Sequence, residues 1–173
     1  MKKHKAKKHS KKHAKKNKGF SLIELLIVVA IIPIIAAIAI PNLLRSRIAA
    51  NEASAVGSLR TLNTAEVTYN TTYPTVGFGS LAALGPVSGG GSPTSAAAGL
   101  IDANLASGTK SGYTFTYTPG AAAANGVVST YTNVAVPLNI GVTGQRGFFS
   151  NQSGVIRYSL SGAAPTAASS ALQ

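Results

Sequence analysis

Cysteine and tryptophan are absent from this chain of 173 residues, and only four of its residues are acidic. Without cysteine the chain has no disulfide framework and no thiolate chemistry. All three histidines lie within the first nineteen residues, so the rest of the chain lacks the commonest general base. That remaining part is rich in alanine, glycine, serine and threonine. This composition favours an extracellular or assembled structural protein over a cytosolic enzyme.

The few acidic residues are too scattered to form a catalytic or metal site. Glu52 and Glu66 lie about 21 Å apart along a helix, too far to act as a carboxylate pair. A calcium site needs several clustered oxygen ligands, and Asp102 is the one acid in the C-terminal part of the chain. Serines are numerous, but no base stands ready to activate one. We therefore expect no enzyme activity, no metal and no cofactor.

The net charge of +12 belongs to the first nineteen residues. Met1–Gly19 contains ten of the eleven lysines and no acid, whereas the rest of the chain has a net charge of +2. Such a block cannot bury apolar surface and is expected to be disordered. It is either an arm that binds nucleic acid through phosphates or a signal that keeps the N-terminus in the cytoplasm. Its position beside an apolar segment favours the signal, and we predict no specific nucleic-acid partner.

The apolar run Phe20–Pro41 is long enough to cross a membrane. As a helix it spans about 33 Å, against about 30 Å for a hydrocarbon core. The lysines before it place the N-terminus in the cytoplasm, an asymmetry that Arg45 and Arg47 weaken without reversing. The sequence thus predicts a transmembrane helix over residues 20–41.

Two prolines interrupt the helical pattern of this run. Pro33 and Pro41 remove one backbone donor each, and we expect each to kink the helix. The segment between them is either partly unwound or merely bent, and the sequence favours neither alternative.

Helical periodicity continues beyond Pro41 over residues 42–73. Arg47, Asn51, Glu52 and Arg60 fall mainly outside the apolar stripe, and Pro74 ends the pattern. The stripe itself contains Leu44, Ile48, Ala55, Leu59, Leu62, Tyr69 and Tyr73. The two helical segments together predict one rod of some fifty residues.

The remainder, residues 74–160, is expected to be an α+β head. A short helix is predicted over Ser95–Ala106, and the alternation of aromatic residues with threonine over residues 113–118 predicts a half-buried strand. Further strands are expected over 127–136, 146–150 and 155–160, and residues 161–173 are expected to be a loose tail. The fold class is α+β, with the helical rod packed on an antiparallel sheet.

The stretch G-F-S-L-I-E-L-L, from Gly19 to Leu26, resembles the type IV prepilin signature, and the similarity continues through I-A-I-P-N-L at 38–43. The resemblance covers the leader and the helix into its amphipathic half, and the head carries a less specific likeness to pilin heads. The chain departs from the family pattern at Pro33, where glycine is commoner.

The resemblance implies that a prepilin peptidase cuts between Gly19 and Phe20 and that the new amine of Phe20 is N-methylated. A charge inside a membrane costs about 2.5–3.5 kcal/mol on insertion scales, so Glu24 calls for a partner. The hypothesis is that Glu24 of one subunit pairs with the Phe20 amine of its neighbour and sets the register of a filament. Contact of Glu24 with the assembly machinery is the competing possibility.

The resemblance therefore implies a structural precursor of a type IV pilus filament, in contact with membrane lipid before assembly and with the inner-membrane assembly machinery. Its expected location is the bacterial inner membrane, then the extracellular pilus. The alternatives are the major pseudopilin of a type II secretion system, which builds a periplasmic pseudopilus, a minor pilin, or an uncleaved membrane-tethered binding domain. The scarcity of acids counts against the calcium-binding pseudopilin.

Overall fold

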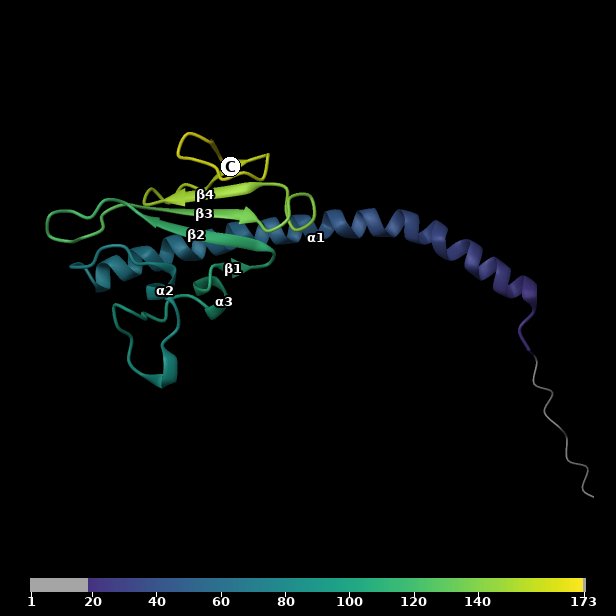
Figure 1. The fold of residues 1–173 in the computed structure, drawn as a ribbon, viewed down its shortest axis with the longest axis horizontal. Coiled ribbons are helices and arrows are strands. Elements are labelled where there is room, and N and C mark those ends of the chain that lie inside the picture. The colour runs from purple at the N-terminus through teal and green to yellow at the C-terminus, as the bar shows by residue number, and fades with distance from the viewer. Residues whose placement is uncertain (1–18, 173) are drawn as a thin grey trace, which may run out of the picture. The chain divides into compact units, whose positions relative to one another are not determined.

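The computed structural model describes residues 19–172 and contains two compact units, Met1–Ile40 and Pro41–Gln173. The expected leader, apart from Gly19, lies outside the described residues. The helix α1, Leu22–Thr72, has 51 residues and extends through both units (Figure 1). This confirms the expected long rod. It is helical between Pro33 and Pro41 without an unwound turn, because each proline removes one donor and leaves the other helical hydrogen bonds. Whether it kinks there stays a prediction.

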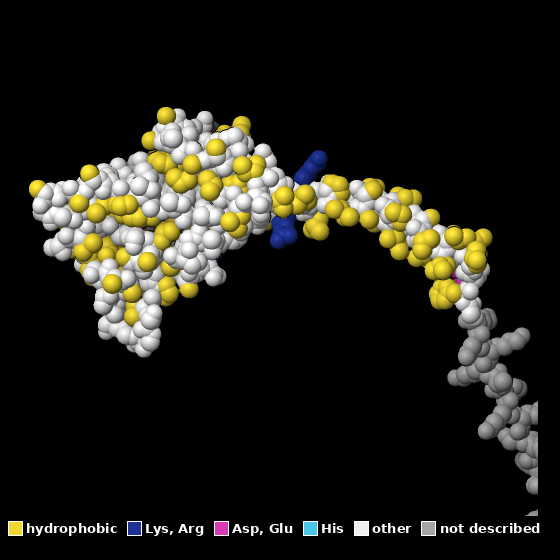
Figure 2. All heavy atoms as spheres, viewed as in Figure 1, with side chains coloured by type: hydrophobic (Ala, Val, Ile, Leu, Met, Phe, Trp, Pro, Cys, Tyr) yellow, Lys and Arg dark blue, Asp and Glu magenta, His cyan; other side chains and the backbone are white. Residues whose placement is uncertain are grey.

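The described part of the first unit, residues 19–40, has no buried core. Every large apolar side chain from Leu22 to Ile40 is exposed, with exposed fractions between 47 % and 75 %. Within the described residues, α1 is the helix that is long and apolar enough to span a membrane. Figure 2 shows these side chains as a nearly continuous hydrophobic surface.

The second unit contains a six-stranded antiparallel sheet in which spatial order follows chain order, β1 to β6. Its strands are β1 (Thr109–Lys110), β2 (Tyr113–Pro119), β3 (Tyr131–Pro137), β4 (Gly147–Asn151), β5 (Arg157–Ser159) and β6 (Ser170–Ala171). The longest ladder joins β2 to β3 over seven residue pairs, from Tyr113 opposite Pro137 to Pro119 opposite Tyr131. The expected α+β fold with an antiparallel sheet is confirmed.

One face of the sheet packs on the second part of α1. On β3, Tyr131, Asn133, Ala135 and Pro137 alternate with partly exposed residues, as a half-buried strand requires. The core combines residues of α1, the short helices and the sheet, among them Ala55, Leu59, Leu62, Tyr69, Leu84, Leu105, Tyr113, Phe115 and Phe148. The stripe expected on α1 is therefore correct from Ala55 onward, whereas Leu44 lies exposed before the head begins.

Three details of the head differ from expectation. The helix predicted over Ser95–Ala106 forms only as α3, Ala103–Ala106, because Asp102 caps it by accepting the Leu105 N–H at 3.1 Å. Two further short elements, α2 (Leu81–Leu84) and the 3₁₀ turn η1 (Ser88–Gly90), precede it. The expected loose tail contains β6, which pairs with β5 and thus extends the sheet.

Candidate assembly and processing site

Gly19 and Phe20 begin the described chain as an accessible, non-helical segment. The Phe20 side chain is 88 % exposed, and nothing lies within 4 Å of the position where a side chain on Gly19 would begin. The first helical residue is Leu22. The backbone between Gly19 and Phe20 is therefore open to a protease, as cleavage there would need.

Glu24 forms a contact that the sequence analysis missed. Its Oε2 accepts the backbone N–H of Ser21 at 2.8 Å, and Ser21 directly precedes the helix. This is the glutamate half of a capping box, in which an acid at the third helical position satisfies the N–H of the capping residue. The helix dipole also favours a carboxylate in the first turn. The pattern S-L-I-E was the signal that could have revealed this cap.

The capping contact also determines where the carboxylate lies relative to Phe20. Ser21 follows Phe20 directly, so the hydrogen bond to Ser21 places Glu24 close to Phe20. Cleavage after Gly19 would turn the backbone nitrogen of Phe20 into a free amine. The carboxylate is exposed in the single chain. The structure therefore brings the sequence-predicted residues Gly19, Phe20 and Glu24 together at one end of α1, whereas Pro33 and Pro41 lie within the helix.

Glu52 was expected outside the buried face of α1, and this expectation was wrong. Its side chain is buried because Arg146, which lies far along the chain, supplies a partner. The Arg146 Nε donates to Oε2 at 2.7 Å, and the backbone N–H groups of Gln145 and Arg146 donate to Oε1 at 2.9 and 3.0 Å. Burial alone would raise the pKa of Glu52, but these donors more than offset it, so the pKa lies below its usual value. The contact fastens α1 to the loop before β4.

Glu66 is also buried, and no cation among residues 19–172 pairs with it. Its side chain is 0 % exposed, and Oε2 accepts the Gly79 N–H at 3.0 Å, while Oε1 has no hydrogen-bond partner among residues 19–172. Burial raises the pKa of Glu66 to about 7, and the Gly79 hydrogen bond opposes this only in part. Glu66 thus holds the segment after α1 by a single hydrogen bond.

The remaining acidic residue, Asp102, lies apart from the other carboxylates. Residues 19–172 contain no group of three or more histidine, cysteine, aspartate or glutamate side chains placed to hold a metal ion. Asp102 accepts from Lys110 Nζ at 2.8 Å besides capping α3, so it serves the head's structure.

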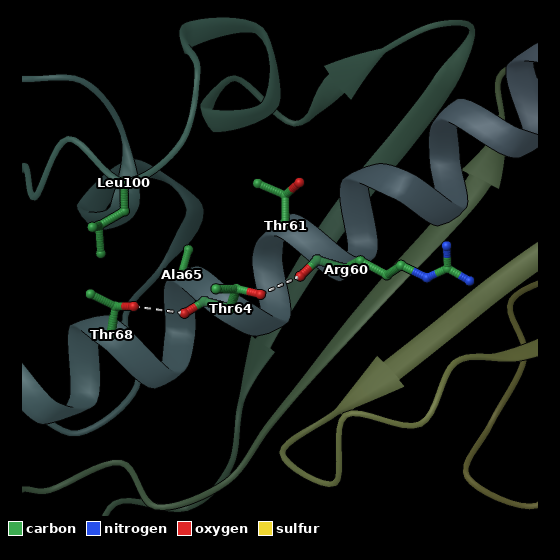
Figure 3. Close-up of a pocket in the computed structure, with 6 residues that line it drawn as sticks. All are labelled: Arg60, Thr61, Thr64, Ala65, Thr68 and Leu100. Atoms are coloured by element: carbon green, nitrogen blue, oxygen red, sulfur yellow. Dashed lines mark hydrogen bonds between the residues drawn. The ribbon is translucent and has the colours of Figure 1, made fainter.

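A shallow pocket of about 450 Å³ lies on the second half of α1, and the hydroxyls of two threonines that line it already donate hydrogen bonds (Figure 3). Thr64 and Thr68 line it, but their hydroxyls donate to backbone carbonyls one turn earlier in the same helix. The threonines therefore present no free donor to a ligand. The lining consists of Arg60, Thr61, Thr64, Ala65, Thr68 and Leu100.

Residues 14–40 match the prokaryotic N-terminal methylation motif. Over 54 residues the chain is 48 % identical to the type IV major pilin protein PilA of Myxococcus xanthus, covering 31 % of this chain and 24 % of that protein. Over 35 residues it is 69 % identical to the type IV wide pilus major component PilA4 of Thermus thermophilus, covering 20 % of this chain and 27 % of that protein. The chain thus spans about a quarter of the length of the curated relatives it matches. No solved structure matches the chain significantly.

These comparisons agree with the resemblance seen in the sequence. The methylation motif includes Gly19, Phe20 and Glu24, the residues that lie together at the start of α1. Both relatives are named as pilus components, and the match to each is partial.

Proposed function

We propose that this chain is the precursor of a structural subunit of a type IV pilus, and that it polymerises through the first half of α1. The observation that carries the proposal is the methylation motif on a helix whose apolar side chains have no partner within the described chain. A surface of this kind is stable in lipid or against other subunits, and not in water. The same helix therefore serves as a membrane anchor first and as the filament core later.

Processing begins at Gly19–Phe20. A prepilin peptidase cuts this bond, and the amine of Phe20 is N-methylated. The exposed, non-helical backbone before α1 supports this assignment. Removal of the leader also removes ten lysines, which hold the N-terminus on the cytoplasmic side of the inner membrane until cleavage. The head then lies on the outer side, from which the inner-membrane assembly machinery adds the subunit to a growing extracellular filament.

Glu24 has two roles in this proposal, and they differ in what they require. Capping the Ser21 N–H needs an acceptor, which glutamine supplies as well as glutamate. Pairing with the cationic amine of a neighbouring subunit's Phe20 needs the negative charge itself. The ion pair offsets the cost of a carboxylate at membrane depth and sets the axial register between subunits.

The experiment that tests the proposal is mass spectrometry of filaments sheared from the surface of the native host. A chain that begins at N-methylated Phe20 in this fraction supports a surface pilin. Processed chain confined to the inner-membrane fraction would instead indicate a pseudopilin of a type II secretion system or a minor subunit. An unprocessed chain that keeps Met1–Gly19, in a host with active peptidase, would contradict the proposal and indicate a membrane-tethered domain.

A further inference from the structure

Two arginines follow the apolar part of α1 and have no partner within the described chain. Between Gly19 and Asn51 the charged residues are Glu24, Arg45 and Arg47. Both arginines are exposed, and neither guanidinium forms an ion pair with any of residues 19–172. Two long cations that the fold leaves unpaired are free to bind an external anion.

The winding of the helix places these cations on opposite sides at one level. Positions two apart are rotated by about 200° and separated by about 3 Å along the axis. In Figure 2, dark blue Lys or Arg side chains project on both sides of the helix where its apolar part ends. Arg45 and Arg47 are four and six residues beyond Pro41, or about 6–9 Å past the apolar run. The headgroup layer of a bilayer is about 5–7 Å thick on each side, so long arginine side chains at this height reach its phosphates.

We propose that Arg45 and Arg47 form a collar that binds the phosphates of anionic phospholipids in the outward-facing leaflet, before the subunit enters a filament. The assignment to the outward-facing leaflet rests on the proposed function, which gives the orientation of the helix in the membrane. Because its two cations lie on opposite sides of the helix, the collar fixes the height of the helix in the leaflet and prefers anionic lipids by charge, without a pocket that distinguishes one anionic headgroup from another.

Charge complementarity favours lipid over a second copy of the head. The acids of residues 41–172 are Glu52, Glu66 and Asp102. Glu52 and Asp102 already pair with Arg146 and Lys110, and Glu66 is fully buried. A neighbouring head therefore offers the collar no free carboxylate, whereas an anionic leaflet offers a phosphate on every side.

Cleavage changes which leaflet holds the chain. The precursor has ten lysines on the leader side and two arginines on the other. In the processed chain the new Phe20 amine and Glu24 balance each other, while Arg45 and Arg47 remain. The electrostatic attachment thus passes from the cytoplasmic to the outward leaflet, the side from which a filament subunit must be extracted.

The test uses the full chain with Leu43→Trp, reconstituted into vesicles of mixed zwitterionic and anionic phospholipid. Because the chain has no tryptophan, this exposed position gives a single fluorescent reporter beside the collar. Brominated acyl chains quench tryptophan on contact, so brominated phosphatidylglycerol and brominated phosphatidylcholine are compared in otherwise identical vesicles. Contact quenching excludes lipids that the leader lysines attract in the opposite leaflet.

The expected result is a preference for the anionic quencher of up to about twenty-five-fold at low salt, about fivefold for each arginine, that falls at about 1 M salt. The variant Arg45→Gln with Arg47→Gln should lose this preference. Arg60→Gln is the matched control, since it removes an exposed arginine about 20 Å further along α1 and should change nothing.

Equal quenching by both lipids in the unaltered collar would overturn the proposal. The proposal would also be overturned if the variant Arg45→Gln with Arg47→Gln kept the lipid preference in vesicles but gave no filaments in cells. The arginines would then bind a protein partner. A leader that remains uncut in cells would contradict the proposed function without changing the quenching result, so the two failures are distinguishable.

Discussion

The two halves of α1 share one helical backbone but differ in the burial of their apolar side chains. From Leu22 to Ile40 the apolar side chains are exposed, whereas Ala55, Leu59 and Leu62 of the second half are fully buried against the head. The more hydrophobic half is thus the one without a core. The difference teaches that burial within one chain does not measure what a helix is for, since the proposed function matches the first half to lipid or to other subunits.

The three glutamates of α1 extend the comparison. Glu24 is exposed and caps its own helix, Glu52 is buried with three donors of which one is the Arg146 guanidinium, and Glu66 is buried with one donor. The same side chain therefore has an external, a satisfied and a partly satisfied environment within one helix. Each environment predicts a different response to removal of the charge.

The largest effect is expected at Glu24, where a glutamine and an alanine variant separate capping from ion pairing. We expect Glu24→Gln to keep the cap, membrane insertion and cleavage, but to lose surface filaments as completely as Glu24→Ala. The glutamine lacks the charge that pairs with a neighbouring amine. The measurement is the yield of sheared filaments against processed chain in the membrane. Filaments at ordinary yield from Glu24→Gln would leave Glu24 as a cap alone.

A matched pair of apolar truncations tests the two halves directly. Leu59→Ala opens a cavity in a fully buried position and should lower the free energy of unfolding of the head by about 3–4 kcal/mol. Ile31→Ala, at an exposed position, should change it by less than about 0.5 kcal/mol. Urea unfolding of the full chain in detergent, followed by near-ultraviolet circular dichroism, measures both. Equal losses would show that the first half also supports the head.

Glu66 should make the stability of the head depend on pH. The folded state keeps the Glu66 proton up to about pH 7, whereas the unfolded chain releases it near pH 4.5. The contribution is therefore greatest below pH 4.5 and falls as pH rises to about 7, by up to about 3 kcal/mol. The neutral variant Glu66→Gln should flatten this slope and be more stable than the natural chain at pH 8. Glu24→Gln serves as the control, and an unchanged slope in Glu66→Gln would assign the pH dependence elsewhere.

Glu52 should respond in the opposite direction and more weakly. Its lowered pKa means that its contribution is present above about pH 4.5 and is lost as pH falls further. Glu52→Gln weakens the hydrogen bonds from Arg146 and the backbone, at a cost of about 2 kcal/mol at neutral pH. The same unfolding measurement, repeated at pH 7 and pH 3, should show the difference between variant and natural chain shrinking in acid. A constant difference would mean that the carboxylate charge contributes nothing.

Local patterns were enough to predict most of the architecture. The apolar run and the helical stripe gave one long helix, and the alternation around Phe115 gave β2. Period and composition carry this information because they reflect the faces that each element buries. The short elements were missed because four residues, as in α2, are too few to establish a period.

Long-range pairing accounts for what could not be predicted. Glu52 is charged and so was expected on the exposed face, but its partner Arg146 lies 94 residues away. Glu66 is held by Gly79, whose backbone N–H carries no signal in the sequence. The Ser21–Glu24 cap, by contrast, is local and could have been predicted from S-L-I-E. Glu24 was interpreted only as a charge within an apolar run.

The strand order of the head also sets the order in which it can fold. Each strand from β1 to β6 hydrogen-bonds to its neighbour in sequence, so every closure is local and none waits for a distant strand. Because α1 precedes the sheet in the chain, the helix that the sheet packs on is synthesised before any of the strands. β6 has two residues, lies at the outer edge and pairs with β5, so a chain shortened there loses one border of the sheet and keeps every other ladder.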